Sequence, residues 1–131
     1  MITIKTPSEI ALMRESGKLT RDVLELAGRS IRPGMTTKEL DKIAHDFIRD
    51  NGAYPSFLGY GGYPASTCIS INDMVVHGIP SDDIIIREGD IVSVDVGTIL
   101  NGWQGDAART FAVGEISEEK KKLVKVTEEC F

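Results

Sequence analysis

Asp95 and Asp106 are the residues best suited to chemistry, because each is an acid set among apolar and small neighbours. They lie in segments 91–100 and 103–113, whose alternating and β-branched residues predict two strands. Asn101-Gly102 joins the segments and is typical of a two-residue hairpin turn. The sequence therefore predicts a hairpin with one aspartate on each strand.

A two-residue turn fixes the pairing of the strands, with Gly97 opposite Asp106 and Asp95 opposite Ala108. Cross-strand partners share a face, so Asp95 and Asp106 become diagonal neighbours with Cβ atoms about 7–8 Å apart. The opposite face carries a row of apolar residues, Val92, Val94 and Val96. The carboxylates can therefore lean together while the valines contribute to a core.

Two carboxylates about 4 Å apart repel by about 4 kcal/mol at an effective dielectric constant of roughly 20. A half-buried pair must therefore share a proton, contact a basic side chain or bind a cation. Arg109 projects from the opposite face, which makes it a poor partner. Carboxylates suit divalent ions such as Mn²⁺ or Fe²⁺. The alternative is that one aspartate only caps backbone amides, and the residues alone leave both interpretations open.

His77 is the second candidate, because it precedes a Gly-Ile-Pro turn where a side chain can project into a cleft. A lone histidine is more often structural than catalytic, so both roles stay open. His45, among polar residues of a predicted helix, is expected to be solvated. Aromatic and thiol side chains nearby either line an apolar pocket or pack beneath a loop: Phe57, Tyr60, Tyr63 and Cys68.

Helices must support these residues from outside the hairpin. Capping boxes at Thr6-Pro7-Ser8-Glu9 and Thr36-Thr37-Lys38-Glu39 predict two amphipathic helices, the first to about Ser30 and the second to Gly52. Ser117 caps a third helix that is still running at the last residue. We expect two or three helices packed on an antiparallel sheet, an α/β (α+β) fold.

Shorter strands are expected before the hairpin, at residues 66–71, 74–77 and 84–86. Residues 53–64 are rich in glycine, proline and aromatic residues and are expected to form a loop.

The composition limits the classes of function. A chain of 131 residues fits a single domain, and a net charge of −5 with a pI of about 5.0 argues against a nonspecific nucleic-acid surface. No apolar run reaches the roughly 20 residues of a membrane helix, and the N-terminus is unlike a signal peptide. Cys68 and Cys130 are expected to be free thiols, which indicates a cytoplasmic protein without membrane contact.

The segments GYGGYPASTCISINDMVVHGIP, GDIVSVDVG and GDAARTF, in this order, resemble the bacterial type I methionine aminopeptidases. The resemblance extends over the whole chain from KTPSEI. It implies a pita-bread (creatinase/aminopeptidase-like) fold, in which two pseudo-symmetric halves enclose two metal ions. Residues 1–131 would be a single domain, the N-terminal half of the enzyme, cut inside a helix.

The same resemblance implies roles for the site residues. Asp95 would chelate one divalent ion of the Mn, Fe, Co or Zn class, and Asp106 would bridge two such ions. A water made acidic by the ions would attack the first peptide carbonyl, while His77 hydrogen-bonds the scissile amide. The methionine side chain would enter a pocket lined by Phe57, Tyr60, Tyr63 and Cys68. Many bacterial members have a cysteine where this chain has Phe57, which alters the pocket there.

The length of the chain departs from the family pattern. The family's catalytic domain is about twice as long, and its second half supplies a histidine and two glutamates to the metals. We therefore expect residues 1–131 alone to bind metal weakly and to be inactive. We also expect an exposed apolar face that favours self-association.

The implied function is removal of the N-terminal methionine from peptides and nascent proteins, with the ribosome as a further candidate partner. One alternative is another pita-bread hydrolase, an Xaa-Pro aminopeptidase or prolidase. A second is a non-catalytic pita-bread binding module associated with ribosomes, although such relatives tend to lose the metal residues. A third is a half-domain without a function of its own.

Overall fold

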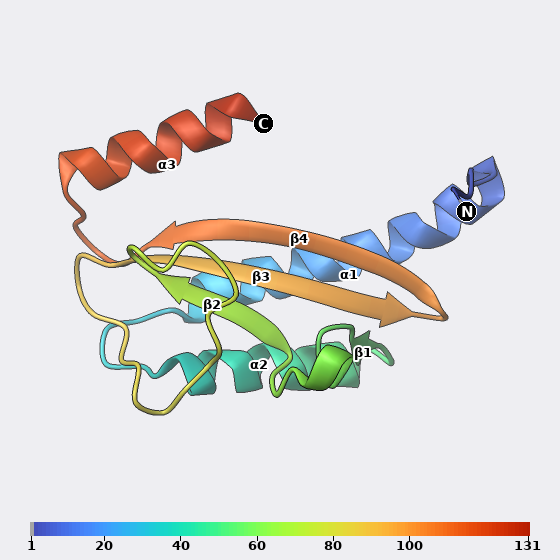
Figure 1. Ribbon diagram of the computed structural model, residues 1–131, viewed down its shortest axis with the longest axis horizontal. Helices are drawn as coiled ribbons and strands as arrows, with labels where there is room; N and C mark the ends of the chain where they lie inside the picture. The colour runs from blue at the N-terminus through green and yellow to red at the C-terminus, as the bar shows by residue number, and fades with distance from the viewer. Residues whose placement is uncertain (1) are drawn as a thin grey trace.

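The computed structural model describes residues 2–131 as three α-helices and a four-stranded antiparallel sheet (Figure 1). The helices are α1 (Pro7–Ser30), α2 (Thr37–Asp50) and α3 (Glu118–Cys130). The strands are β1 (Tyr54–Pro55), β2 (Thr67–Ile71), β3 (Ile91–Leu100) and β4 (Trp103–Ala112). The predicted fold class, helices packed on an antiparallel sheet, is confirmed.

Both predicted capping boxes are present. Thr6 accepts a hydrogen bond from the backbone N–H of Glu9, whose carboxylate accepts the N–H of Thr6, and Thr36 and Glu39 repeat the arrangement. Each box satisfies two backbone donors that a helix start leaves without partners. Gly52, just beyond α2, has a φ of +72°, as its predicted role in ending the helix requires.

The hairpin of β3 and β4 forms the middle and one edge of the sheet. Asn101 and Gly102 have φ values of +51° and +83°, which a type I′ turn needs. Gly97 lies opposite Asp106, as predicted. On its other side β3 pairs with β2 and with the short strand β1.

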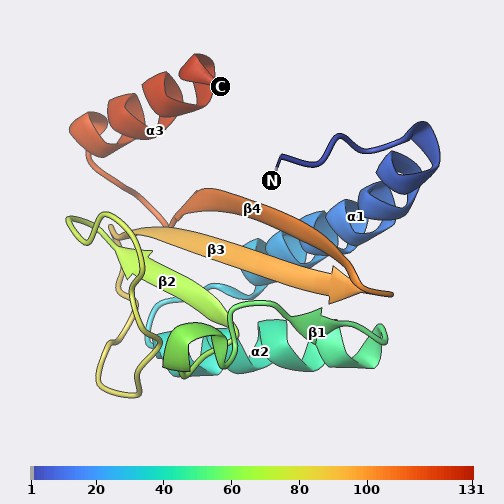
Figure 2. The same ribbon diagram turned by 45° about the vertical axis from the view of Figure 1, so that its right-hand side comes forward.

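Helices α1 and α2 cover one face of the sheet (Figure 2). The three valines of β3 predicted to face a core have no exposed surface. They pack with apolar residues of both helices, including Leu19, Val23, Leu24, Leu40, Ala44 and Ile48. The core therefore lies on the valine face, and the aspartate face is left free of α1 and α2.

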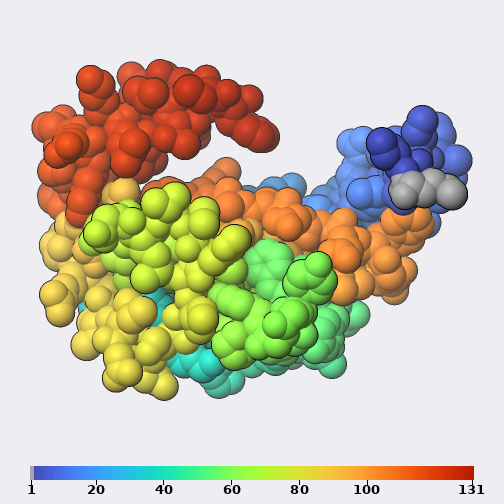
Figure 3. All heavy atoms as spheres, in the orientation of Figure 1, coloured from blue at the N-terminus to red at the C-terminus, as the bar shows by residue number. Residues whose placement is uncertain are grey.

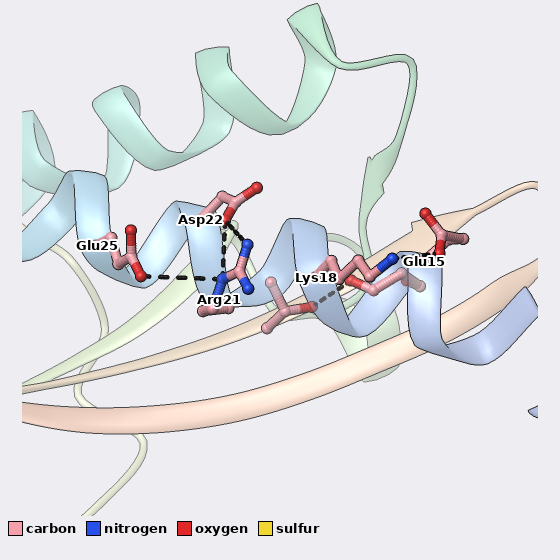
Figure 4. A network of polar contacts seen from close by, with 7 residues as sticks. Glu15, Lys18, Arg21, Asp22 and Glu25 are labelled. Carbon is pink, nitrogen blue, oxygen red and sulfur yellow. Dashed lines mark hydrogen bonds and ion pairs between the residues drawn. The ribbon is translucent and has the colours of Figure 1, made fainter. Parts of the chain in front are cut away.

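The outer face of α1 carries exposed ion pairs (Figure 4). Lys18 contacts Glu15 at 2.7 Å, and Arg21 contacts Asp22 at 2.7 Å and Glu25 at 3.8 Å. Such exposed pairs contribute little to stability because water screens them. This face is therefore a solvated surface.

Helix α3 stands apart from the rest of the molecule, with a hollow between it and β4 (Figure 3). It has no buried residue, and Leu123 and Val126 on it are exposed. Ser117 caps it as predicted. Lys120 fixes its first turn by donating to the Gly89 carbonyl at 2.6 Å. Helix α3 is therefore held mainly at its start.

Two strand predictions and one loop prediction need correction. The strand predicted over 74–77 is absent, because the chain turns at residues 72–73 and His77 has a φ of +59°, which is incompatible with a strand. Residues 84–86 form only an isolated bridge, between Ile85 and Thr36. The loop predicted over 53–64 contains β1, which exists because β3 pairs with it.

Among residues 2–131, no helix has the length and apolar character needed to cross a membrane. Cys68 is buried and Cys130 is exposed, and both thiols are free.

Candidate metal and substrate site

Three neighbouring strands present Cys68, Asp95 and Asp106 on the face of the sheet opposite the core. Cys68 of β2 lies opposite Asp95 of β3, and Asp106 of β4 lies opposite Gly97. Because side chains two residues apart share a face, Asp95 and Asp106 are diagonal neighbours. The predicted geometry of the acid pair is therefore confirmed.

A cavity of about 520 Å³ lies over this face, and its size is within the usual range of small-ligand sites. It is lined by every site residue that the sequence singled out, and by one more: Phe57, Tyr60, Tyr63, Cys68, His77, Ile79, Asp95 and Asp106. Residues far apart in the sequence thus share one cavity.

Burial and the neighbouring carboxylate both act on Asp95. The pKa of Asp95 is raised above its ordinary value of 3.8, chiefly by burial and next by the charge of Asp106. His77 opposes these effects weakly through its own charge. Among residues 2–131, neither aspartate forms an ion pair with a lysine or arginine. The pair therefore lacks the basic partner that would neutralise it.

Tyr63 and Cys68, beside the acids, form an uncharged wall of the cavity. Burial raises the pKa of Tyr63, and its contact with Cys68 adds to the rise. Burial likewise raises the pKa of the Cys68 thiol. Both groups stay protonated at neutral pH, so the cavity combines an acidic floor with an apolar, uncharged wall. Such a cavity suits a ligand with a cationic end and an apolar side chain.

Gly97 allows the aromatic loop to approach the acids closely. A Cβ on Gly97 would collide with the Ser56 hydroxyl and would lie 2.7 Å from the Phe57 ring. The Ser56 N–H donates to the Gly97 carbonyl at 3.0 Å, which ties the loop to β3. Glycine at this position is therefore what lets Phe57 pack next to the acids.

The donor set fits part of a divalent metal site. Two adjacent carboxylates without a basic partner are hard oxygen ligands of the kind that Mn²⁺ accepts. Within residues 2–131, however, no group of three or more histidine, cysteine, aspartate or glutamate side chains is arranged to hold a metal. Residues 2–131 thus offer two ligands to such a site.

Ile79 is the cavity residue that the sequence analysis missed. It follows Gly78 in the segment predicted to be a turn, and its side chain is half exposed. An apolar residue within a predicted turn, two positions after His77, was the signal available in the sequence.

The expectation that His45 is solvated was wrong. Its Nδ1 atom lies 2.7 Å from the hydroxyl of Ser66, and the ring is half-buried beside a second cavity of about 390 Å³. Asp41 of the same helix is buried and accepts the N–H groups of Ser66 and Thr67. These contacts dock α2 onto the start of β2, which is a structural role.

Comparison with known proteins connects the chain to a family. The model of metallopeptidase family M24 matches residues 11–131. The chain is 58% identical over 131 residues to a methionine aminopeptidase of Clostridium acetobutylicum, covering all of this chain and 52% of the relative. It is 50% identical over 129 residues to methionine aminopeptidase 1 of Bacillus subtilis, covering 98% and 52%. The chain therefore spans about half the length of these relatives.

Solved structures show the same backbone arrangement. Methionine aminopeptidase from Rickettsia prowazekii superposes with a TM-score of 0.95 at 41% identity, over 98% of this chain and 52% of the other. Aminopeptidase P from E. coli superposes with a TM-score of 0.82 at 28% identity, over 95% of this chain and 27% of the other. The arrangement of helices and sheet is thus shared by both kinds of enzyme.

Proposed function

Because the chain belongs to metallopeptidase family M24, we propose that it functions in the metal-dependent removal of N-terminal methionine from peptides and nascent proteins. The observation that carries the proposal is the cavity in which Asp95 and Asp106 meet an uncharged aromatic wall and His77. The methionine aminopeptidases matched at 58% and 50% identity favour methionine over the substrates of aminopeptidase P, matched at 28%.

Asp95 and Asp106 are the residues that would hold the two divalent ions implied by the family resemblance. Bound divalent metal would supply a water acidic enough to act as a nucleophile at neutral pH. The family resemblance implies that a histidine and two glutamates complete the ligand set. Residues 2–131 contribute two carboxylates toward this set, so we expect weak metal binding and no hydrolysis from these residues alone.

The uncharged wall is the proposed site for the methionine side chain. Phe57, Tyr60, Tyr63 and Cys68 would contact the thioether, and protonated Tyr63 and Cys68 keep this part of the cavity free of charge. His77 would hydrogen-bond the scissile amide and so favour the charge that develops there during hydrolysis.

The substrate is proposed to be the N-terminus of a peptide or of a nascent chain, with the ribosome as the source of nascent chains. We propose a cytoplasmic setting, since free thiols such as Cys68 and Cys130 persist in reducing compartments. The non-catalytic alternative is less favoured because both proposed metal ligands are present.

Mn²⁺ binding to residues 1–131, followed by electron paramagnetic resonance, tests the ligand assignment. Asp95→Asn and Asp106→Asn should each weaken binding at least about tenfold. Losing a ligand should reduce metal affinity at least as much as losing a residue that only hydrogen-bonds to a ligand. Asp83→Asn, at an exposed aspartate outside the cavity, is the matched control and should leave binding unchanged. Equal binding by all three variants would contradict the assignment.

Substrate choice is tested on the product of the complete reading frame. Release of the first residue from Met-Ala peptides should far exceed release from Xaa-Pro peptides. A preference for Xaa-Pro peptides would replace the methionine assignment with the aminopeptidase P alternative.

A further inference from the structure

The backbone of His77 adopts a conformation that it cannot hold by itself. Its φ of +59° lies in the left-handed region, which is unfavourable for residues with a Cβ. The residues before it give little support, because Val75 is 83% exposed and Val76 is 61% exposed. Contacts elsewhere must therefore fix the conformation of His77.

The next residue, Gly78, carries those contacts. Its N–H donates to the Ser70 hydroxyl at 3.0 Å, and its carbonyl accepts the N–H of Ile69 at 2.9 Å. The Tyr63 hydroxyl donates to the same carbonyl at 3.3 Å. A Cβ at Gly78 would collide with the Ile69 carbonyl oxygen, so only glycine lets the loop lie this close to β2. Gly78 is thus held on both its N–H and its carbonyl.

The Ser70 side chain joins this loop to the sheet. The one hydrogen bond described for its hydroxyl is the bond with Gly78. It lies two residues after Cys68 on β2, on the same face as the cavity, and is 3% exposed. Its hydroxyl accepts the Gly78 N–H in a buried environment, where an unmade hydrogen bond is costly. Without this hydrogen bond, a serine at a buried strand position would be less favourable than an apolar residue.

We propose that Ser70 is a positioning residue, which holds Gly78 against β2 and thereby keeps His77 in the left-handed conformation that directs its side chain into the cavity. The purpose of this arrangement rests on the proposed function, in which His77 contacts the scissile amide. Small displacements of such a group are costly, since a shift of about 1 Å can reduce a rate by about 100-fold.

Tyr63 belongs both to the cavity lining and to the contacts that hold Gly78. Its ring lines the cavity while its hydroxyl contacts Gly78, so one side chain touches both the proposed methionine site and the support of His77. The same hydroxyl also lies 3.0 Å from the Thr67 carbonyl, so Tyr63 ties the cavity both to β2 and to the residue that supports His77.

Hydrogen exchange of residues 1–131, measured by NMR, tests the role of Ser70. Ser70→Ala should speed exchange of the Gly78 amide by about tenfold, the effect of one buried hydrogen bond. Exchange of the Val94 amide in the central strand should not change. The Cα shift of His77 should move away from its left-handed value. Ser70→Thr retains the hydroxyl, so its Gly78 exchange rate and His77 Cα shift should equal those of the wild type.

Ser93→Ala is the matched control. Ser93 lies directly opposite Ser70 on β3, and its hydroxyl contacts Thr110 at 2.8 Å. Its removal should leave Gly78 exchange unchanged. Wild-type Gly78 exchange and His77 shifts in Ser70→Ala would overturn the proposal. Equal acceleration by Ser70→Thr would also overturn it, because a hydroxyl would then be present without protecting the Gly78 amide.

Added Mn²⁺ separates this proposal from the proposed function. Relaxation by Mn²⁺ falls steeply with distance, so Ser70→Ala should reduce broadening of the His77 ring signals while broadening of the Cys68 amide persists. Absence of broadening around Asp95 and Asp106 in the wild type would count against the metal site. The exchange and shift data would still decide the role of Ser70.

Discussion

Replacing Gly97 by alanine should destabilise the chain and disturb the cavity at once. The added Cβ would collide with the Ser56 hydroxyl and lie 2.7 Å from the Phe57 ring, so the aromatic loop must move outward. Overpacking of this kind costs about 1–3 kcal/mol. Weakening of the hydrogen bond from the Ser56 N–H to the Gly97 carbonyl adds about 0.5–1.5 kcal/mol. We expect a total loss of about 1.5–4.5 kcal/mol in the free energy of unfolding.

Urea unfolding followed by circular dichroism measures this loss, and Gly17→Ala provides the matched control. Gly17 lies within α1, where a Cβ would have nothing within 4 Å. The same chemical change should there stabilise the chain by about 0.5–1 kcal/mol, because alanine favours a helix. A Gly97→Ala chain as stable as the wild type would refute the argument, as would equal destabilisation by both variants.

Two further predictions concern the acid pair and α3. Asp106→Asn should lower the pKa of Asp95 without reaching its ordinary value, since burial, the larger cause, remains; an NMR titration of its carboxyl carbon measures this. Because folding raises the pKa of Asp95, the contribution of its carboxyl to stability is lost as pH rises from 3.8 through the folded pKa. In urea unfolding between about pH 3 and about pH 7, this contribution should fall more in the wild type than in Asp106→Asn. Lys120→Met removes the hydrogen bond to Gly89 and should speed proteolysis before α3, with the unfolding free energy changed by less than about 1 kcal/mol. Lys122→Met changes an exposed lysine of the same helix, and this variant should be cleaved at the same rate as the wild type.

The parts of the molecule that could be predicted from sequence are those that local residues determine. Two capping boxes fixed the starts of α1 and α2, because each needs only residues within one helical turn. The Asn101-Gly102 turn fixed the register of the hairpin, and hence the shared face of Asp95 and Asp106. These signals needed no knowledge of distant contacts.

The segment around His77 could not be predicted for the opposite reason. Its β-branched residues, Val75 and Val76, favour a strand. The observed backbone depends instead on two hydrogen bonds of Gly78 with β2: its carbonyl accepts the Ile69 N–H, and its N–H donates to the Ser70 hydroxyl. His45 was misjudged in the same way, since its partner Ser66 lies outside its helix. Tertiary contacts overrode the local preference in both cases.

The hairpin also bears on the order in which the site assembles. Hairpins form in about 1–10 μs, whereas contacts between distant segments wait for longer loops to close. Asp95 and Asp106 belong to one hairpin, so their spacing can be set before α1 packs against β4. A chain emerging during synthesis would thus carry its paired carboxylates as soon as Ala112 is free. His77 likewise gains its position when its loop docks on β2, through hydrogen bonds between residues eight and nine positions apart. Hairpin and loop each close over a short stretch of chain, so the acids and the histidine can be positioned independently of each other.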